Sequence, residues 1–427
     1  MISEREFKNK LSLFDAVMLG IGSTMGAGIF VLLSSGFSIA GPAVIIAFLL
    51  NAVIALIIAG NYAEAASFNP VNGGGFSFVE EAYGKKARIL GWIILMGNAS
   101  YASLCAVGFA KYICSLIQIN ELIVSVSVLC LFSLINMTGS KKVALIMKPL
   151  VISLLLMLVF VSIFIFSNPQ VGLVNFSNFT PFGVLSIFPA TSLFFVCFTG
   201  FEAITTISAE IKKPRMNIPK ALLFTVSIVS IIYILVVFAL VYSVDINDLI
   251  GSEVALLEAV KFSPPMMVVI IICATIAVLS SLNAAIMAAS RNVYALARDK
   301  FLPTSLSSIN SKYELPHQAI IITFIISFSL VLSNHVEFIA SITNLSYMII
   351  VSSVGLAVLK LRKLEDKSSF KLPFHPLGPI LCIILPLILI PFLEISSIII
   401  CAVWTIIGMI IYWITKNRRM NHEKSTI

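Results

Sequence analysis

The residues best suited to bind a small charged molecule lie in an apolar segment near the N-terminus, from Leu13 to Ile39. The middle of this segment reads GSTMGAG over residues 22–28, with three glycines and a Ser-Thr pair. Glycine weakens a helix, yet a helix in lipid must satisfy all of its own backbone N–H and C=O groups. A broken helix is therefore tolerated at membrane depth only where the freed groups face a cavity or a polar ligand. Half-helix ends offer donors to an anionic group and acceptors to a cationic one, so the segment predicts a site for a small zwitterion.

A second interruption of the same kind lies in the apolar segment 184–207. Residues 194–206 read FFVCFTGFEAITT and place Thr199, Gly200 and Glu202 in mid-segment. The two interrupted segments are the first and sixth apolar spans of the chain, which are equivalent positions in two five-span halves. Interrupted spans at equivalent positions of inverted halves point to a transport site near the membrane midplane.

Composition defines the elements that must position these residues. The chain has 427 residues, of which 59% are hydrophobic and 11% charged, and its mean hydropathy is +1.05. Soluble domains carry about 25% charged residues, so we expect an all-α polytopic membrane protein. Windows of about 20 apolar residues, the length of a membrane helix, predict twelve spans near 14–35, 42–63, 89–112, 121–138, 144–167, 184–207, 220–244, 265–290, 317–333, 337–359, 377–393 and 396–415.

The twelve spans are expected to form a single transmembrane domain, because no long linker or low-complexity run divides the chain. We expect a first repeat over 12–167, a second, inverted repeat over 184–363 and two additional helices over 375–415. Nearly all Lys and Arg residues fall on the side where the first span begins, and the exceptions are Lys111 and Lys261. The positive-inside rule then predicts a multi-pass protein of the plasma (inner) membrane with both termini in the cytoplasm. The net charge of +8 reflects this topology and does not indicate nucleic-acid binding.

Metal, cofactor and enzyme chemistry find little support in the sequence. The seven cysteines lie within or at the ends of apolar segments and form no CxxC pair, so we expect no disulfide, cofactor or structural metal. No HExxH, GxSxG or His/Cys cluster lies in a span, which argues against an intramembrane enzyme. The short polar start runs directly into a long first span, so we expect no cleavable signal peptide.

Four motifs together resemble the amino acid–polyamine–organocation (APC) permeases. They are GSTMGAGIF over 22–30, the loop with Pro70, Gly73 and Gly74, GFEAITTISAEIKKPRMNIPKA over 200–221, and SSLNAAIMAASRNVYALARDKFLP over 280–303. Together they cover roughly residues 12–303 in the right order and spacing. The resemblance implies a LeuT-like fold, with a five-plus-five inverted repeat, broken helices 1 and 6 and two extra C-terminal helices. It also implies alternating access and an amino acid or related amine as cargo, moved by proton or sodium coupling or by exchange.

The two breaks define the predicted substrate site. N–H groups around Ala27 and Gly28 would hold the substrate carboxylate, and carbonyls near Gly22 and Ser23 would face its ammonium, a role that the resemblance carries onto the same positions. Many relatives place a bulky aromatic gate where this chain has Val196, and a neighbouring phenylalanine could substitute for it. Small apolar side chains in both breaks indicate a pocket without a fixed charge for the substrate side chain. The predicted substrate-binding residues are Gly22, Ser23, Thr24, Gly26, Ala27, Gly28, Asn98, Phe195, Cys197, Phe198, Thr199 and Gly200.

Two of these predictions have plain structural alternatives. The glycines of the first span could serve only close packing between helices, as small residues do in membrane proteins. Asn98 could equally be a polar contact between helices, which is worth about 0.6 kcal/mol.

Five residues are candidates for ion coupling or gating. Glu202 lies deep in a span, where an ionisable group points to function, although a protonated carboxyl hydrogen-bonded into the bundle is an equal alternative. Glu64 lies at the inner end of the second span and predicts a cytoplasmic gate pair with a loop cation. Lys148 falls about a turn and a half before the position where some proton-coupled relatives carry a lysine, so we expect it to snorkel to the inner surface. Ser280 and Ser281 could instead supply hydroxyls to a sodium ion, or bond back to backbone carbonyls. The sequence leaves the coupling ion open.

These features predict a secondary active transporter that moves amino acids, neutral rather than cationic, by alternating access with proton coupling or exchange. A sodium-coupled symporter and an exchanger of amines, polyamines or cationic amino acids are the alternatives within this class. An exchanger of cations would need acidic pocket groups, and Glu202 is the only mid-membrane candidate. A transport-like sensor without flux is the rival from another class, and we would expect it to carry a signalling domain. The expected partners are the small substrate, a proton or sodium ion, and membrane lipid.

Overall fold

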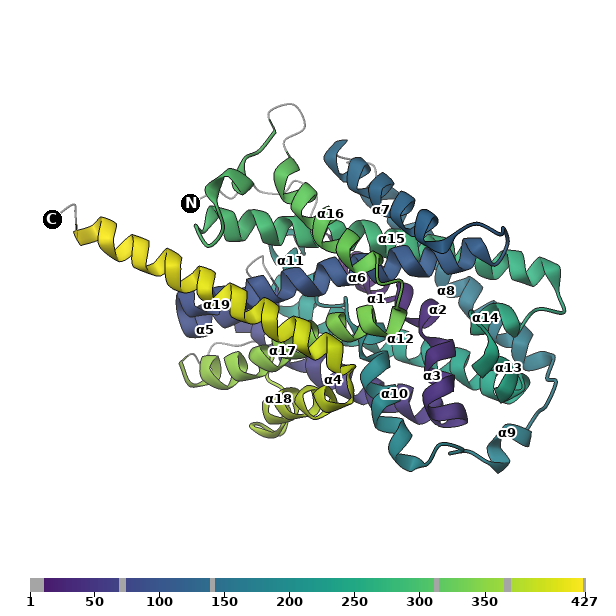
Figure 1. Ribbon diagram of the computed structural model, residues 1–427. Helices are drawn as coiled ribbons and strands as arrows, with labels where there is room; N and C mark the ends of the chain where they lie inside the picture. The colour runs from purple at the N-terminus through teal and green to yellow at the C-terminus, as the bar shows by residue number, and fades with distance from the viewer. Residues whose placement is uncertain (1–10, 69–73, 139–142, 311–314, 365–369, 425–427) are drawn as a thin grey trace.

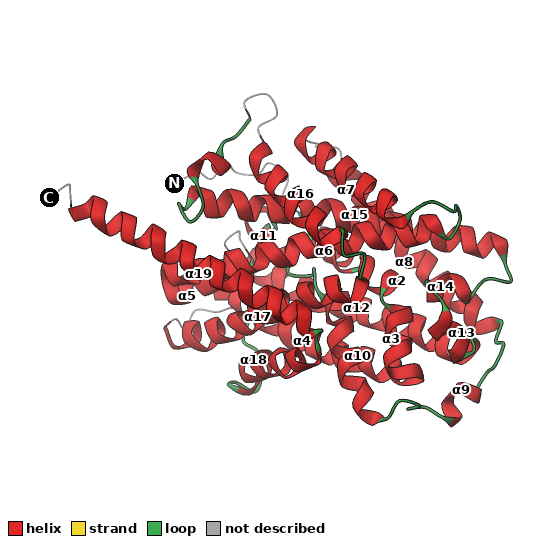
Figure 2. Cartoon of the chain, in the orientation of Figure 1, coloured by secondary structure: helices red, strands yellow, loops and turns green. Residues whose placement is uncertain are grey.

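The computed structural model describes residues 11–68, 74–138, 143–310, 315–364 and 370–424. Every long element in these residues is a helix (Figure 2), and the extended structure among them is limited to two isolated bridges, Leu11 with Ile211 and Asn310 with Leu315. The helices satisfy their own backbone hydrogen bonds, as a membrane span must. The all-α architecture predicted from the composition is thus confirmed. The motif loop with Pro70 and Gly73 lies outside the described residues.

Ten apolar helical segments in the described residues are long enough to cross a membrane, and two shorter apolar helices complete the twelve predicted spans. The spans are α1 (Leu13–Thr24) with α2 (Ala27–Val31), α3 (Leu33–Ala40) with α4 (Val44–Phe68), α6 (Arg88–Cys114), α7 (Glu121–Thr138), α8 (Val143–Ser167), α10 (Ile187–Phe194) with α11 (Ala203–Thr206), α12 (Pro214–Ser243), α15 (Pro264–Arg298), α16 (His317–Val331), α17 (Val336–Leu364), α18 (Leu377–Leu389) and α19 (Ile395–Lys424). The connections contain the short helices α5 (Gly75–Tyr83), α9 (Val174–Ser177), α13 (Ile246–Gly251) and α14 (Ala255–Glu258).

Burial separates central spans from peripheral ones. In the most apolar window of each span, 89% of the residues are buried in α6, against 17% in α19 and 22% in α7. The yellow helix α19 accordingly runs along the outside of the bundle (Figure 1). The central helix α6 contacts α2, and α15 contacts both α1 and α2. Helices α4 and α17 contact α10. The two broken spans therefore lie inside a cage of intact helices.

The most extensive helix contacts join equivalent spans of the two predicted halves. Helix α6 packs most extensively against α15, and α4 packs against α12. These are the third with the eighth span and the second with the seventh. The repeat boundaries at 12–167 and 184–363, with 375–415 outside the repeats, stay a prediction.

The helix order gives the bundle two ends, which we name by the first helix. The first face is the membrane face at which α1 begins, and the second face is the opposite one. Helices α13 and α14 group at the second face, at the end of the bundle away from the projecting C-terminal part of α19 (Figure 1).

Candidate functional site

The first span is interrupted at Met25 and Gly26. Helix α1 ends with the Met25 N–H donating to the Ile21 oxygen at 2.8 Å, and the Gly26 N–H then donates to the Thr24 oxygen at 2.9 Å. Gly26 leaves the helical region with φ −115° and ψ −144°, and α2 begins at Ala27. The first N–H groups of a helix have no partner within it. The break therefore ends one run of helical hydrogen bonds at Met25 and begins another at Ala27, where the sequence predicts a binding site.

The sixth span is interrupted between Thr199 and Glu202. The 3-10 turn η4 (Phe195–Phe198) closes its first half, and Thr199 is extended, with φ −92° and ψ 161°. Gly200 has φ +110°, a conformation that glycine adopts readily and other residues avoid. The Oε2 atom of Glu202 accepts a hydrogen bond from the Gly200 N–H at 2.8 Å. The carboxyl group of Glu202 thus holds the turn that interrupts its own span.

The two breaks touch each other through their glycines. A Cβ atom added at Gly200 would lie 2.3 Å from the carbonyl oxygen of Ser23. A Cβ atom added at Gly28 would lie 2.7 Å from the sulfur and 2.8 Å from the Cα atom of Cys197. Both distances are far shorter than van der Waals contact, so neither glycine can carry a side chain without moving backbone. The structure therefore brings together the backbones of four predicted site residues from opposite halves of the chain.

Hydroxyl groups from three further spans surround the first break. A Cβ atom at Gly26 would meet the hydroxyl oxygens of Tyr101 at 2.2 Å and Ser281 at 2.3 Å. The Ser281 side chain is buried, so its hydroxyl is held beside the break. From α12, the Tyr233 hydroxyl donates to the Thr24 carbonyl at 3.3 Å. Close packing therefore requires glycine at position 26, and the groups that pack against it are polar.

Ser280 differs from its neighbour. Its hydroxyl bonds back to the Ala277 carbonyl at 2.9 Å, within its own helix. Of the two serines proposed for sodium, Ser281 is the one whose oxygen is next to the break.

A small cavity lies beside the sixth-span break. Its volume is about 10 Å³, which is room for roughly one water molecule. Glu202 is the one ionisable group among the residues that line it, and Val351, one helical turn after Tyr347 on α17, lines it too. The other lining residues are mainly apolar, namely Asn51, Ile54, Ala55, Ile58, Phe195, Phe198, Thr199, Phe201 and Val351. The sixth-span break therefore borders a nearly filled space between α4, η4 and α17.

Asn98, a predicted substrate ligand, is engaged by another helix. Its Oδ1 atom accepts a hydrogen bond from the Tyr347 hydroxyl of α17 at 2.8 Å, and its side chain is buried. Tyr347 therefore links Asn98 to the surroundings of Glu202.

The first face is closed by an ion pair and by backbone contacts. The Glu64 Oε1 atom lies 3.2 Å from the Arg362 Nε atom, and its Oε2 atom accepts from the Leu372 N–H at 2.8 Å. Next to them, the Leu11 N–H donates to the Glu210 oxygen at 2.7 Å, which ties the start of the first span to the end of the sixth. The sequence predicts a loop cation for Glu64, and the cation that pairs with it in the structure is Arg362. Helix α17 continues to Leu364, beyond its predicted end at 359, so the cation belongs to a helix.

Lys148 is far along the helix axis from the break. Its ammonium pairs with the Asp15 carboxylate in the first turn of α1, where Ser12 and Asp15 form a capping box. The Lys148 side chain is 48% exposed. Asp15 precedes Met25 by ten residues, or about 15 Å of helix at 1.5 Å per residue. Lys148 and the first break therefore lie at different depths.

Sequence reasoning missed three residues that the structure places at or near the site. Tyr233 and Tyr347 are hydroxyls in long apolar helices, and that polarity was a usable signal. Arg362 could not be found in this way, because its pairing with Glu64 depends on how the second and tenth spans pack.

Comparison with known proteins gives a matching family and several relatives. A family model described as amino acid permease matches residues 11–423. The branched-chain amino acid permease BcaP of Bacillus subtilis is 28% identical, covering 98% of this chain and 96% of the relative. BcaP of Lactococcus lactis subsp. cremoris is 24% identical with the same coverage. A methylthioribose transporter of Bacillus subtilis is 27% identical, covering 87% of this chain and 85% of the relative.

Proposed function

Because the chain belongs to the amino acid permease family, we propose that it moves neutral amino acids across the plasma membrane by alternating access. The family consists of membrane transporters and not of enzymes. The observation that carries the proposal is the direct contact between the first- and sixth-span breaks. Gly200 packs against the Ser23 carbonyl, and Gly28 packs against Cys197. A ligand between them would meet helix-end donors on one side and helix-end carbonyls on the other.

The surroundings of the breaks favour a neutral substrate with an apolar side chain. Cys197 and Phe198 are buried apolar groups, and Glu202 is engaged by the Gly200 N–H. A cationic side chain would need an acidic partner that is free to receive it. Two relatives are named branched-chain amino acid permeases, which supports leucine, isoleucine or valine as the substrate. The methylthioribose transporter among the relatives makes methylthioribose the competitor to test beside them.

For the driving force we propose a proton gradient or exchange. Glu202 is an ionisable group in mid-span, where its charged form is costly, and its carboxyl holds the sixth-span turn. A change in its protonation would change the hydrogen bond that fixes Gly200. Sodium would have to rely on Ser281 and carbonyls, because no group of three or more His, Cys, Asp or Glu side chains suited to a metal exists among the described residues. Lys148 is proposed to anchor α8 to the start of α1 and not to couple ions.

We further propose that the first face is cytoplasmic, since nearly all Lys and Arg residues gather there. The Glu64–Arg362 pair would then be part of the cytoplasmic gate. Arg362→Met should lower the uptake rate, because the buried Glu64 loses its partner. The double variant Glu64→Gln/Arg362→Met should recover most of that rate. A double variant as slow as the single one would argue against the ion pair as the gate.

Uptake into proteoliposomes tests the proposed function. Purified protein is reconstituted with a pH gradient, a sodium gradient or preloaded leucine only, and labelled leucine is followed in the presence of each of the twenty amino acids or methylthioribose. We expect neutral branched amino acids to compete, and uptake to respond to pH or to preloading. Accumulation driven by sodium with no effect of pH would contradict the coupling. Competition by methylthioribose or polyamines, and not by neutral amino acids, would contradict the substrate class.

A further inference from the structure

A hollow opens on the second face, directly beyond the first-span break. Its volume is about 350 Å³, within the range of small-molecule sites. Its walls come from α2, α3, α6, α13, the following loop and the start of α17. Val31 in its wall is three residues from Gly28, or about 4.5 Å along a helix. This wall of the hollow is therefore less than one helical turn from Gly28.

One wall of the hollow carries a lysine whose charge is not neutralised. Lys111 and Lys261 are the two basic residues that depart from the positive-inside pattern. Lys261 pairs with Asp248 and Glu258, and hydrogen bonds to these two carboxylates raise its pKa. Lys111 forms no ion pair among the described residues, yet it is half-buried and lines the hollow. A lysine near a helix C-terminus is stabilised by the helix dipole. The dipole does not explain why carboxylates line the hollow opposite Lys111.

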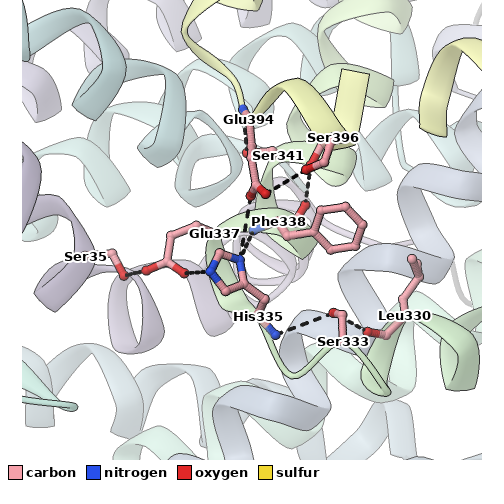
Figure 3. Close-up of polar contacts among 10 residues, drawn as sticks. Ser35, Leu330, Ser333, His335, Glu337, Phe338, Ser341, Glu394 and Ser396 are labelled. Carbon is pink, nitrogen blue, oxygen red and sulfur yellow. Dashed lines mark hydrogen bonds and ion pairs between the residues drawn. The ribbon is translucent and has the colours of Figure 1, made fainter. Parts of the chain in front are cut away.

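Two carboxylates line the same hollow. Glu337 lies in the first turn of α17 and receives a hydrogen bond from the Ser35 hydroxyl of α3, and its Oε2 atom lies 3.8 Å from the His335 Nε2 atom (Figure 3). The Nδ1 atom of the same histidine accepts a hydrogen bond from the Phe338 N–H at 3.3 Å and lies 3.6 Å from the Glu394 carboxylate. Glu253 is exposed and forms no ion pair among the described residues. A carboxylate has about four lone-pair sites, so Glu337 can accept further donors.

The remaining walls are both apolar and hydroxylic. Val31, Ile39, Ile250 and Val336 provide apolar surface, and Ser34 and Ser38 provide hydroxyls. A cation, carboxylates and apolar surface around one space match the three parts of a zwitterion with an apolar side chain. A simple anion would not account for the carboxylates, and a simple cation would not account for Lys111.

We propose that this hollow is a second amino acid site, which takes the substrate from the second face before it reaches the breaks. Lys111 binds the substrate carboxylate, and Glu337 and Glu253 bind its ammonium. Ser35 and His335 act as positioning residues that hold Glu337 toward the hollow. The inference rests on the proposed function, because it assigns the same class of substrate to both sites.

Equilibrium binding of labelled leucine to the purified chain tests the site. The wild type should bind leucine in two phases, and Lys111→Met should weaken the weaker phase by about tenfold, the usual effect of losing a charged hydrogen bond. Lys261→Met is the matched control, since that lysine already has partners, and should bind as the wild type does. Gly28→Val should lose the tighter phase and keep the weaker one. Competition adds a readout: 4-methylpentanoate, which lacks the amine, should lose its effect in Lys111→Met, and isopentylamine, which lacks the carboxylate, should lose its effect in Glu337→Gln.

The outcomes separate this site from the proposed function. A single phase in the wild type that Gly28→Val removes would overturn the second site and leave the proposed function intact. A weaker phase that is unchanged in Lys111→Met would do the same. Absence of leucine binding to the wild type would contradict the neutral amino acid function, and with it this site.

Discussion

The break in the first span is short and made of backbone, whereas the break in the sixth span is longer and carries an acid. In the first span, Gly26 and Gly28 have negative φ and are required by what lies against them, namely hydroxyls and Cys197. In the sixth span, Gly200 needs its positive φ as well, and Glu202 closes the turn. The difference suggests a division of labour. We propose that the first break supplies a fixed binding surface, and that the sixth supplies the conformational and titratable element.

Gly200→Ala should have the largest effect, because it combines backbone strain with a clash. A Cβ atom would lie 2.3 Å from the Ser23 oxygen in a conformation with φ +110°. We expect a loss of about 3 kcal/mol in stability and no measurable leucine uptake. Gly183→Ala is the matched control, since Gly183 has φ +82° and open space around its Cβ position. Equal uptake by the two variants would show that the contact between the breaks does not matter.

Glu202→Gln should have an intermediate effect. The glutamine oxygen can still accept from the Gly200 N–H, so the turn and the maximal rate should be largely retained. The variant cannot titrate, so the pH profile of leucine uptake should flatten. Glu210→Gln, outside the break, serves as control and should keep the wild-type profile. If Glu202→Gln kept the wild-type pH profile too, neither break would contain the group whose titration controls uptake.

Lys148→Ala should have the smallest effect. The Lys148–Asp15 pair is partly exposed and lies at the start of α1, so its loss should cost less than about 1 kcal/mol. Uptake driven by a pH gradient should persist in proteoliposomes. Loss of that uptake in a variant that melts like the wild type would show that the titrating group is Lys148 and not a group in the sixth-span break.

The sequence was sufficient for the spans and for both breaks, because each rests on a local signal. Apolar length determines a membrane helix, and the glycines of 22–28 and Gly200 mark where the helices must stop. Local signals could not identify partners that come together only through packing. Arg362 meets Glu64, and Tyr347 meets Asn98, across helices far apart in the chain. The hollow at Lys111 was visible only as an exception to the charge pattern, since its carboxylates come from separate segments.

The central claim is that the substrate binds where the two breaks touch, and leucine exchange tests it most directly. Labelled leucine is supplied outside proteoliposomes that are preloaded with unlabelled leucine, so no ion gradient is needed. The wild type and the control Gly251→Val, whose Cβ position is in open space, should exchange at similar rates. Gly28→Val should not exchange leucine, because the Cβ atom of the new side chain would lie only 2.7 Å from the Cys197 sulfur and would force the two breaks apart. Exchange by Gly28→Val at the wild-type rate would contradict the claim.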